Sequence, residues 1–466
     1  MLLNIRQSVG PSTEPLEDHY DELAHHYTKG GNTDKAIEYL HLAGKQAAQR
    51  SAHSEAIGHL IQALELLKIL DDTPARAKQE LALQMTLGLS QMVTKGLGAP
   101  EAGLAYDRAY ALCRQIGDRP EVIDVLWGLC TFYLSGQSEV KKAHAIAEQL
   151  LRVAEAQNDP ISLMKAHLTM SGTLYFQGEL LAACAHTEYC IGVFDTDKTI
   201  QTTNFDFEVA THGRAALTLW LLGYPAQAVV SNTTALGLAH EQAGPIMSAV
   251  MFTFSAMVHR WRGETQVTRE YAEAALKLSH EYGLKLIWAP GTILHGAALV
   301  ELGLQENLSR EVGEAVAALR GSRLESGVPH LLAAVAEIDG KAGKIDDALS
   351  FLGEAIEIST RRGERYYQAE LYRLKGEMSL RFGGENPTNA VQRDAEACFE
   401  QALEIAKEQS AKSWELRTST SLARLWQQQG KQAEAHNLLS EIYNWFTEGF
   451  DTKDLQDAKA LLEALA

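Results

Sequence analysis

A repeat with a fixed step of 40 residues runs through the middle of this chain of 466 residues. A small residue opens each unit, and a glycine follows it seven residues later. The five pairs are Ala216 and Gly223, Ala256 and Gly263, Gly296 and Gly303, Ala336 and Gly343, and Gly376 and Gly383. The same spacing recurs at Ala24 and Gly31, at Ser171 and Gly178, and at Ala423 and Gly430. Such a repeat predicts a stack of equivalent units that bury their apolar faces against one another.

The residue types of the repeat predict that each unit is a hairpin of two antiparallel helices. Small side chains let two helices pack closely, and a glycine ends the first helix because it tolerates the left-handed backbone. The second helix brings its own small residue to the contact, as Ala36 does after Gly31. No run with the two-residue alternation of a strand competes with this pattern. We therefore predict an all-α fold, a right-handed α–α superhelix of about 9 to 11 helical hairpins.

Three regions are expected along the chain. Residues 1–15 are polar, contain two prolines and predict a flexible arm. Residues 16–440 form the repeat array, with longer loops at 195–206 and 383–393. Residues 441–466 are expected to form helices that cap the array.

Four strings carry a more specific resemblance: Tyr20–Tyr27, Tyr367–Gly376, Ser421–Gly430 and Trp445–Leu455. The repeat itself resembles that of the tetratricopeptide family, whose unit has about 34 residues. The strings resemble the C-terminal region of bacterial regulators that join a nucleotide cyclase domain, an AAA-type predicted ATPase domain and a long repeat tail. This resemblance runs from about residue 16 to the end. It implies a regulatory arm in bacterial signalling, which docks a partner such as a cyclase or ATPase domain.

The chain departs from those regulators because it lacks the Gly-x-x-x-x-Gly-Lys-Ser/Thr phosphate loop. We therefore expect neither ATP hydrolysis nor synthesis of a cyclic nucleotide. The chain would be a stand-alone homologue, or one piece of a split or truncated regulator. The absence of a Gly-x-Ser-x-Gly elbow also argues against a hydrolase of that type, so no catalytic residue is assigned.

Composition excludes several kinds of partner. The net charge of −18 argues against nucleic acid and anionic membranes. No apolar run approaches the length of a membrane span, and the N-terminus lacks the apolar core of a signal peptide, so a cytoplasmic location is expected. The five cysteines include no Cys-x-x-Cys pair, and no His-Glu-x-x-His occurs, so we expect neither a metal nor a cofactor.

The resemblance places the binding surface on the concave face, which the first helix of each unit lines. Residues one and four positions after each small residue should face it. The candidate partner-binding residues are Tyr175, Leu217, Trp220, Met257, Arg260, Arg424 and Gln427, together with Arg373, which lies one turn before Glu377 on the same face. Aromatic residues flanked by arginines predict a protein or peptide partner with apolar residues and a carboxylate. The alternative for Tyr175 and Trp220 is that they pack between helices as core.

Other features leave alternatives open. A superhelix closed on itself could enclose a pocket for an apolar small molecule, which would make the chain a sensor. Four histidines in different first helices either meet across the groove or make ordinary hydrogen bonds between helices. They are His167, His212, His259 and His295. Glu370, Arg373 and Glu377 have the spacing of ion pairs on a solvent-exposed helix face.

Overall fold

The computed structural model describes residues 19–50, 52–96, 98–117, 121–137, 139–196, 205–242, 244–304, 308–321, 326–384 and 386–466. The predicted arm at residues 1–15 and most of the predicted loop at 195–206 lie outside these ranges. Within them the chain forms helices and turns and no strand, so the predicted all-α superhelical repeat fold is confirmed. No described helix combines the length and the apolar character that a membrane-spanning segment needs.

The chain divides into two compact units, of which the first ends at Phe132. Its helices are α2 (Tyr20–Lys29), α3 (Thr33–Gln49), α4 (His53–Leu67), α5 (Pro74–Lys95), α6 (Pro100–Ile116) and α7 (Val122–Thr131). Leu40, Leu60 and Leu83 bring α3, α4 and α5 together in a buried core. A short π-helix, η2 (Phe132–Gly136), follows α7.

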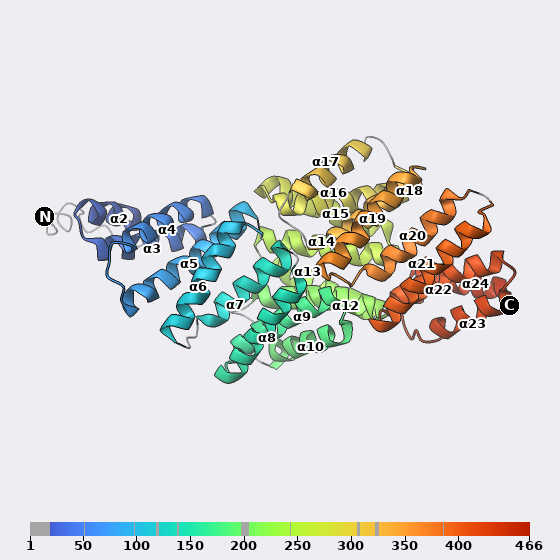
Figure 1. Ribbon diagram of the computed structural model, residues 1–466, viewed down its shortest axis with the longest axis horizontal. Coiled ribbons are helices and arrows are strands. Elements are labelled where there is room, and N and C mark those ends of the chain that lie inside the picture. The colour runs from blue at the N-terminus through green and yellow to red at the C-terminus, as the bar shows by residue number, and fades with distance from the viewer. Residues whose placement is uncertain are drawn as a thin grey trace. The chain divides into compact units, whose positions relative to one another are not determined.

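The second unit runs from Tyr133 to Ala466 and contains the 40-residue repeat. Its helices are α8 (Val140–Gln157), α9 (Pro160–Gln177), α10 (Leu180–Thr196), α12 (Phe205–Leu221), α13 (Pro225–Gln242), α14 (Pro245–Arg262), α15 (Thr265–Tyr282), α16 (Lys285–Glu301), α17 (Leu308–Gly321), α18 (Val328–Lys341), α19 (Ile345–Arg362), α20 (Gln368–Phe382), α21 (Asn389–Glu408), α22 (Lys412–Gln428), α23 (Gln432–Tyr443) and α24 (Lys453–Leu465) (Figure 1). In the predicted cap at 441–466, the described helical segments are thus the end of α23 and all of α24.

The repeat residues occupy equivalent places in the second unit. The five small residues are buried in α12, α14, α16, α18 and α20. Gly223, Gly263, Gly303 and Gly343 follow the first four of these helices with φ between +75° and +91°, the left-handed backbone that glycine tolerates. The fifth unit differs, because Gly383 keeps a helical φ of −69° and Gly384 turns the chain with φ +75°. The turn therefore comes one residue later than the spacing predicts.

The second unit closes on itself. The backbone N–H of Arg365, just before α20, donates to the carbonyl of Phe176 in α9 at 2.6 Å. The Arg262 guanidinium, at the end of α14, lies 2.9 Å from the carboxylate of Asp451, just before α24. In Figure 1 the red helix α22 accordingly lies beside the green helix α12. The first helices of the early repeats thus contact the last repeats and the cap.

This closure buries an aromatic cluster. The ring centroid of Trp220 lies 5.0 Å from that of Trp261 and 4.8 Å from that of Trp414. Tyr367 adds a ring 5.1 Å from Trp414, and the His330 ring lies 4.7 Å from that of Tyr367 with a tilt of 53°. All five side chains are at most 2% exposed. The contacts of Trp414 with Trp220 and Tyr367 are edge-to-face, and such contacts stabilise a core beyond the area that they bury.

Candidate partner-binding groove

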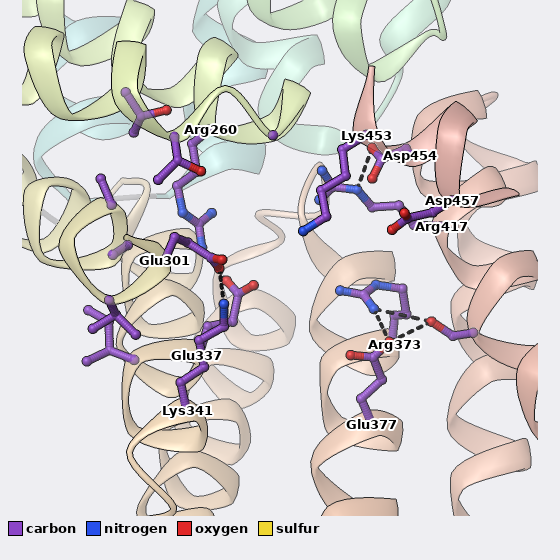
Figure 2. Close-up of a pocket in the computed structure, with 18 of the residues that line it drawn as sticks. Arg260, Glu301, Glu337, Lys341, Arg373, Glu377, Arg417, Lys453, Asp454 and Asp457 are labelled. Carbon is purple, nitrogen blue, oxygen red and sulfur yellow. Dashed lines mark hydrogen bonds and ion pairs between the residues drawn. The ribbon is translucent and has the colours of Figure 1, made fainter. Parts of the chain in front are cut away.

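A groove of about 260 Å³ opens on the inner face of the second unit. Helices α14, α16, α18, α20, α22 and α24 line it, together with the start of α15 (Figure 2). Its charged residues are Arg260, Glu301, Glu337, Lys341, Arg373, Glu377, Arg417, Arg424, Lys453, Asp454 and Asp457. Six cations and five carboxylates therefore face a single space.

The repeat explains why these side chains converge. The residue directly after the small repeat residue lines the groove in four successive units, as Ala297, Glu337, Glu377 and Arg424. Because the first helices of successive units are equivalent, equivalent positions point to the same inner face. The side chain at this position therefore points to the groove in each of these units, but its chemical type changes from apolar to acidic to basic.

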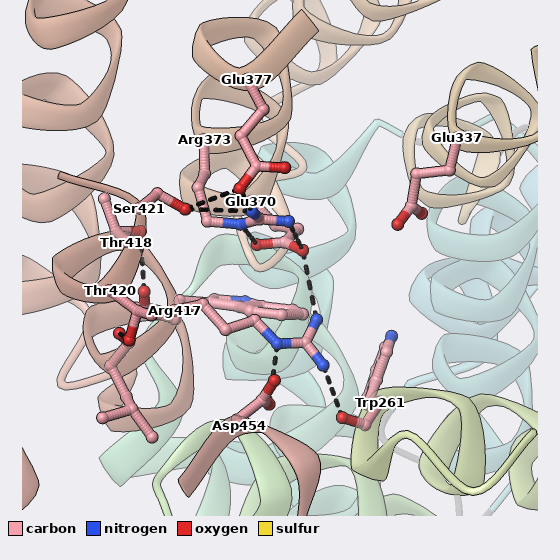
Figure 3. Close-up of polar contacts among 12 residues, drawn as sticks. Trp261, Glu337, Glu370, Arg373, Glu377, Arg417, Thr418, Thr420, Ser421 and Asp454 are labelled. Carbon is pink, nitrogen blue, oxygen red and sulfur yellow. Dashed lines mark hydrogen bonds and ion pairs between the residues drawn. The ribbon is translucent and has the colours of Figure 1, made fainter. Parts of the chain in front are cut away.

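A buried ion network fixes two of the arginines. Glu370 accepts hydrogen bonds from Arg373 Nε at 2.7 Å and Nη2 at 2.8 Å, and from Arg417 Nη1 at 3.2 Å (Figure 3). Arg373 Nη1 also donates to Glu377 at 2.6 Å and to the Ser421 hydroxyl at 3.2 Å. The expectation that Glu370 lies on a solvent-exposed face is wrong, because this residue is only 1% exposed. The first helix of the next repeat, α22, packs beside α20 and brings Arg417 against this carboxylate.

The charge on Glu370 is stabilised by its partners. Burial acts against ionisation, but Arg373 and Arg417 outweigh it, and the pKa of Glu370 lies below its ordinary value of 4.5. Arg417 is held from two further sides, by Asp454 at 2.8 Å and by the carbonyl of Trp261 at 2.5 Å. Fixed guanidinium groups bind with little loss of side-chain entropy.

The remaining cations differ in how firmly they are paired. Arg260 pairs with Glu337, and Lys341 pairs with Glu301. Arg424 lies 3.8 Å from Asp457 in a pair whose side chains are both nearly half exposed. Lys453 is exposed, and among the described residues its ammonium makes no ion pair. Arg424 and Lys453 are therefore the cations most available to a ligand. Arg424 would give up only a weak, exposed ion pair, and Lys453 has no ion pair to lose.

The structure separates the candidate residues into two groups. Arg260, Arg373 and Arg424 line the groove. Tyr175, Leu217 and Trp220 are at most 2% exposed, and Met257 is 9% exposed. Gln427 is partly buried on α22 and does not line the groove.

The closure of the unit buries two of these residues, Tyr175 and Trp220. Tyr175 packs against Tyr366 at a centroid distance of 4.6 Å, and Trp220 packs against Trp414. In both contacts the partner belongs to the last repeats. The surface that the sequence leaves open to a ligand is thus covered by the same chain.

Sequence reasoning missed several residues of the groove. Glu337 follows the repeat residue Ala336 directly, so the rule that selected Leu217 and Met257 could have found it. Lys453, Asp454 and Asp457 carry no such signal, because α24 lies outside the repeat. Arg417 lies six residues before Ala423, at a spacing that the rule does not cover.

The histidines of the first helices do not meet across the groove. His167 bonds to His186, His259 to Glu264, and His295 to Glu273, whereas the buried Nδ1 of His212 has no hydrogen-bond partner among the described residues. In the first unit, Asp21, Glu55 and His59 each place one ligand atom within 4.8 Å of the others. The two carboxylates are exposed, and such surface groups are common without an ion, so we assign no metal to them.

No family model matches the sequence. An uncharacterised protein of Rhizobium meliloti (strain 1021) is 25% identical to it over 421 residues. The match covers 86% of this chain and 39% of that protein, so the chain spans about two-fifths of the relative's length.

Several solved structures have a similar fold. They include a Rap protein complexed with Competence and Sporulation Factor (12% identity, TM-score 0.48, 74% of this chain and 97% of that one) and the APC/C hetero-tetramer Cut9–Hcn1 (10%, 0.49, 97% and 96%). Yeast Tom70 is a third (14%, 0.37, 96% and 95%).

Proposed function

We propose that this chain is a protein-interaction module that regulates a partner by binding a segment of it in the groove. The observation that carries this proposal is the pairing of the groove's cations. Arg373 and Arg417 are fixed by Glu370, whereas Arg424 and Lys453 remain exposed. Fixed groups supply shape, and exposed cations attract an opposite charge. The bound segment therefore carries acidic side chains opposite Arg424 and Lys453.

The partner that the sequence resemblance favours is a nucleotide cyclase or ATPase domain of bacterial signalling. The longer relative from Rhizobium meliloti supports a role beside further domains, because 61% of its length lies outside the match (100% − 39%). The five cysteines are free, which supports a reducing compartment such as the cytoplasm. In this proposal the chain supplies binding and the partner supplies the chemistry.

Charge reversal in the groove tests the proposal. We would immobilise the wild-type chain and an Arg424→Glu/Lys453→Glu variant, and compare the retained proteins by quantitative mass spectrometry. A cyclase or ATPase-type partner should be depleted at least about tenfold by the double reversal, since two lost charge contacts cost over about 1.4 kcal/mol together. Lys277→Glu, on the exposed side of α15, is the matched control. A partner retained equally by all three proteins would show that it binds elsewhere.

Binding of a small molecule is the second candidate, and the charged lining of the groove favours a polar ligand. Its volume of about 260 Å³ is close to the lower end of ligand pockets, about 300 Å³. The buried aromatic cluster does not line this groove, so a ligand of the groove would be polar and charged rather than the apolar ligand that the sequence suggested. A thermal-shift screen with charged metabolites checks this, because a ligand of the folded state raises the melting temperature.

A further inference from the structure

Arg214, on α12, lies outside the groove and has an unusual environment. Its guanidinium carbon lies 4.8 Å from the ring centroid of Tyr175, 5.6 Å from that of Phe176 and 5.9 Å from that of Phe254. Two of these rings come from α9 and the third from α14. Each distance is within the range of a cation–π contact. Aromatic rings from two neighbouring helices therefore surround the cation.

No carboxylate in the described part of the chain forms an ion pair with this guanidinium. Among the described residues, Arg214 makes no ion pair and no hydrogen bond. Burial lowers the pKa of Arg214, and the nearby Tyr175 and Tyr366 partly oppose the change. A guanidinium nevertheless stays protonated at neutral pH and has N–H donors that need acceptors. Unpaired charge away from bulk water is costly, and Arg373 and Arg417 in the same unit both have carboxylate partners.

A second polar group beside Arg214 is also unsatisfied. Tyr175 is 2% exposed, and its hydroxyl has no hydrogen-bond partner among the described residues. Gly172, three residues earlier on α9, has no side chain beside Arg214, and the position that its Cβ would take lies 3.6 Å from Leu134 Cδ2 and 4.0 Å from Arg214 Nη2. Arg214 itself is partly exposed, so the site can be reached from solvent.

We propose that Arg214 anchors an oxyanion site, in which a carboxylate or phosphate group accepts hydrogen bonds from the guanidinium and from the Tyr175 hydroxyl. The planar guanidinium can bind two oxygens of either group side by side. Phe176 and Phe254 exclude water from the faces of the cation, which strengthens its attraction for an anion. The site is separate from the groove and does not depend on the function proposed for it.

The test measures the melting temperature in different anions at matched ionic strength. Wild-type protein should melt about 3 °C or more higher in saturating inorganic phosphate or acetate than in chloride. Arg214→Met should lose this rise, and Arg310→Met, at an exposed arginine, should keep it. General effects of salts on folding act on all three proteins and cancel in the comparison. A rise in phosphate alone identifies a phosphorylated ligand, and a rise in acetate identifies a carboxylate.

An equal anion response in wild type and Arg214→Met would overturn the proposal, because the aromatic contacts alone would then account for the arginine. The same holds if wild type shows no response. If Arg214→Met does not fold, the Nε–H signals of the wild-type arginines are followed by NMR during a phosphate titration, with Arg214→Lys assigning the signal. A saturable shift of the Arg214 signal supports the site, and a constant signal refutes it.

Discussion

The hydroxyl of Ser413 donates a hydrogen bond of 2.5 Å to the carbonyl oxygen of Trp220, which lies 193 residues earlier in the chain. Ser413 opens α22, and Trp220 is in the last turn of α12. In a simple stack of repeats, each unit contacts only its neighbours. This bond therefore marks the place where the second unit returns to its own early repeats. The closure decides which part of the inner face stays open.

Two of the repeat glycines differ in whether the closure of the second unit brings other residues against them. Gly223 has φ +91°, and a Cβ there would lie 2.6 Å from the ring of Trp445 and 2.8 Å from Lys412. Gly303 has φ +75°, but no atom lies within 4 Å of its Cβ position. Gly303→Ala should cost about 1–2 kcal/mol from the left-handed backbone alone. Gly223→Ala should cost about 1–3 kcal/mol more, from the clash. Urea unfolding of both variants measures the difference, and equal costs would mean that the closing contact is absent in solution.

Trp414 should couple distant repeats. It is fully buried and contacts Trp220 and Trp261, so Trp414→Ala should cost about 3–5 kcal/mol. Hydrogen exchange should also become faster in α12, far away in sequence, because the substitution loosens the closure. Trp445→Ala, at a side chain 37% exposed, should have a smaller effect. Faster exchange confined to α20–α24 would contradict a closed unit.

The sequence predicted the helical hairpins because the residues that specify each hairpin lie close together in the chain. Ala216 and Gly223 specify a close helix contact and a turn within seven residues, and every later unit repeats them. The closure has no such local signal. Ser413 and Trp220 belong to different repeats, and nothing in their spacing indicates that they meet.

The sequence predicted only part of the candidate site, because it contains the local orientation of each helix but not the closure. Arg260, Arg373 and Arg424 follow from the orientation of each first helix, and they line the groove. Tyr175 and Trp220 have the same orientation, but the last repeats cover them. Orientation is a property of one unit, whereas exposure depends on the whole superhelix.

Glu370 should be the residue of the groove most sensitive to substitution. Glu370→Gln removes the buried charge that Arg373 and Arg417 share, and the loss of one partner from a buried ion network costs up to about 3–5 kcal/mol, although Glu377 still pairs with Arg373 and Asp454 with Arg417. Glu377→Gln is the control, because its side chain is 26% exposed and solvent can replace the lost contact. Denaturant unfolding at pH 7 compares the two. Similar losses would show that the network is open to solvent.

The pH dependence of stability shows whether the ionised carboxylate of Glu370 stabilises the fold. The pKa of Glu370 is lower in the folded chain than its ordinary value of 4.5. Its contribution to stability is therefore present above pH 4.5, and is lost as the pH falls through the folded pKa. Glu370→Gln should be less stable than wild type at pH 7, and the gap should narrow in acid. A constant gap from pH 7 to pH 3 would exclude this ionisation as the cause.

The histidine pair on α9 and α10 should make the fold sensitive to mild acid. His167 Nδ1 lies 2.8 Å from His186 Nδ1, and burial together with His186 lowers the pKa of His167 to about 4. The unfolded chain takes up a proton near its ordinary pKa of 6.5, whereas the folded chain resists it. Stability should therefore fall as the pH drops from 6.5 toward 4. His167→Gln should reduce this fall, and His280→Gln, at an exposed histidine of α15, should not. The measurement is the melting temperature of each protein between pH 6.5 and pH 4. If all three proteins show the same pH dependence, the histidine pair is not the cause of the loss of stability.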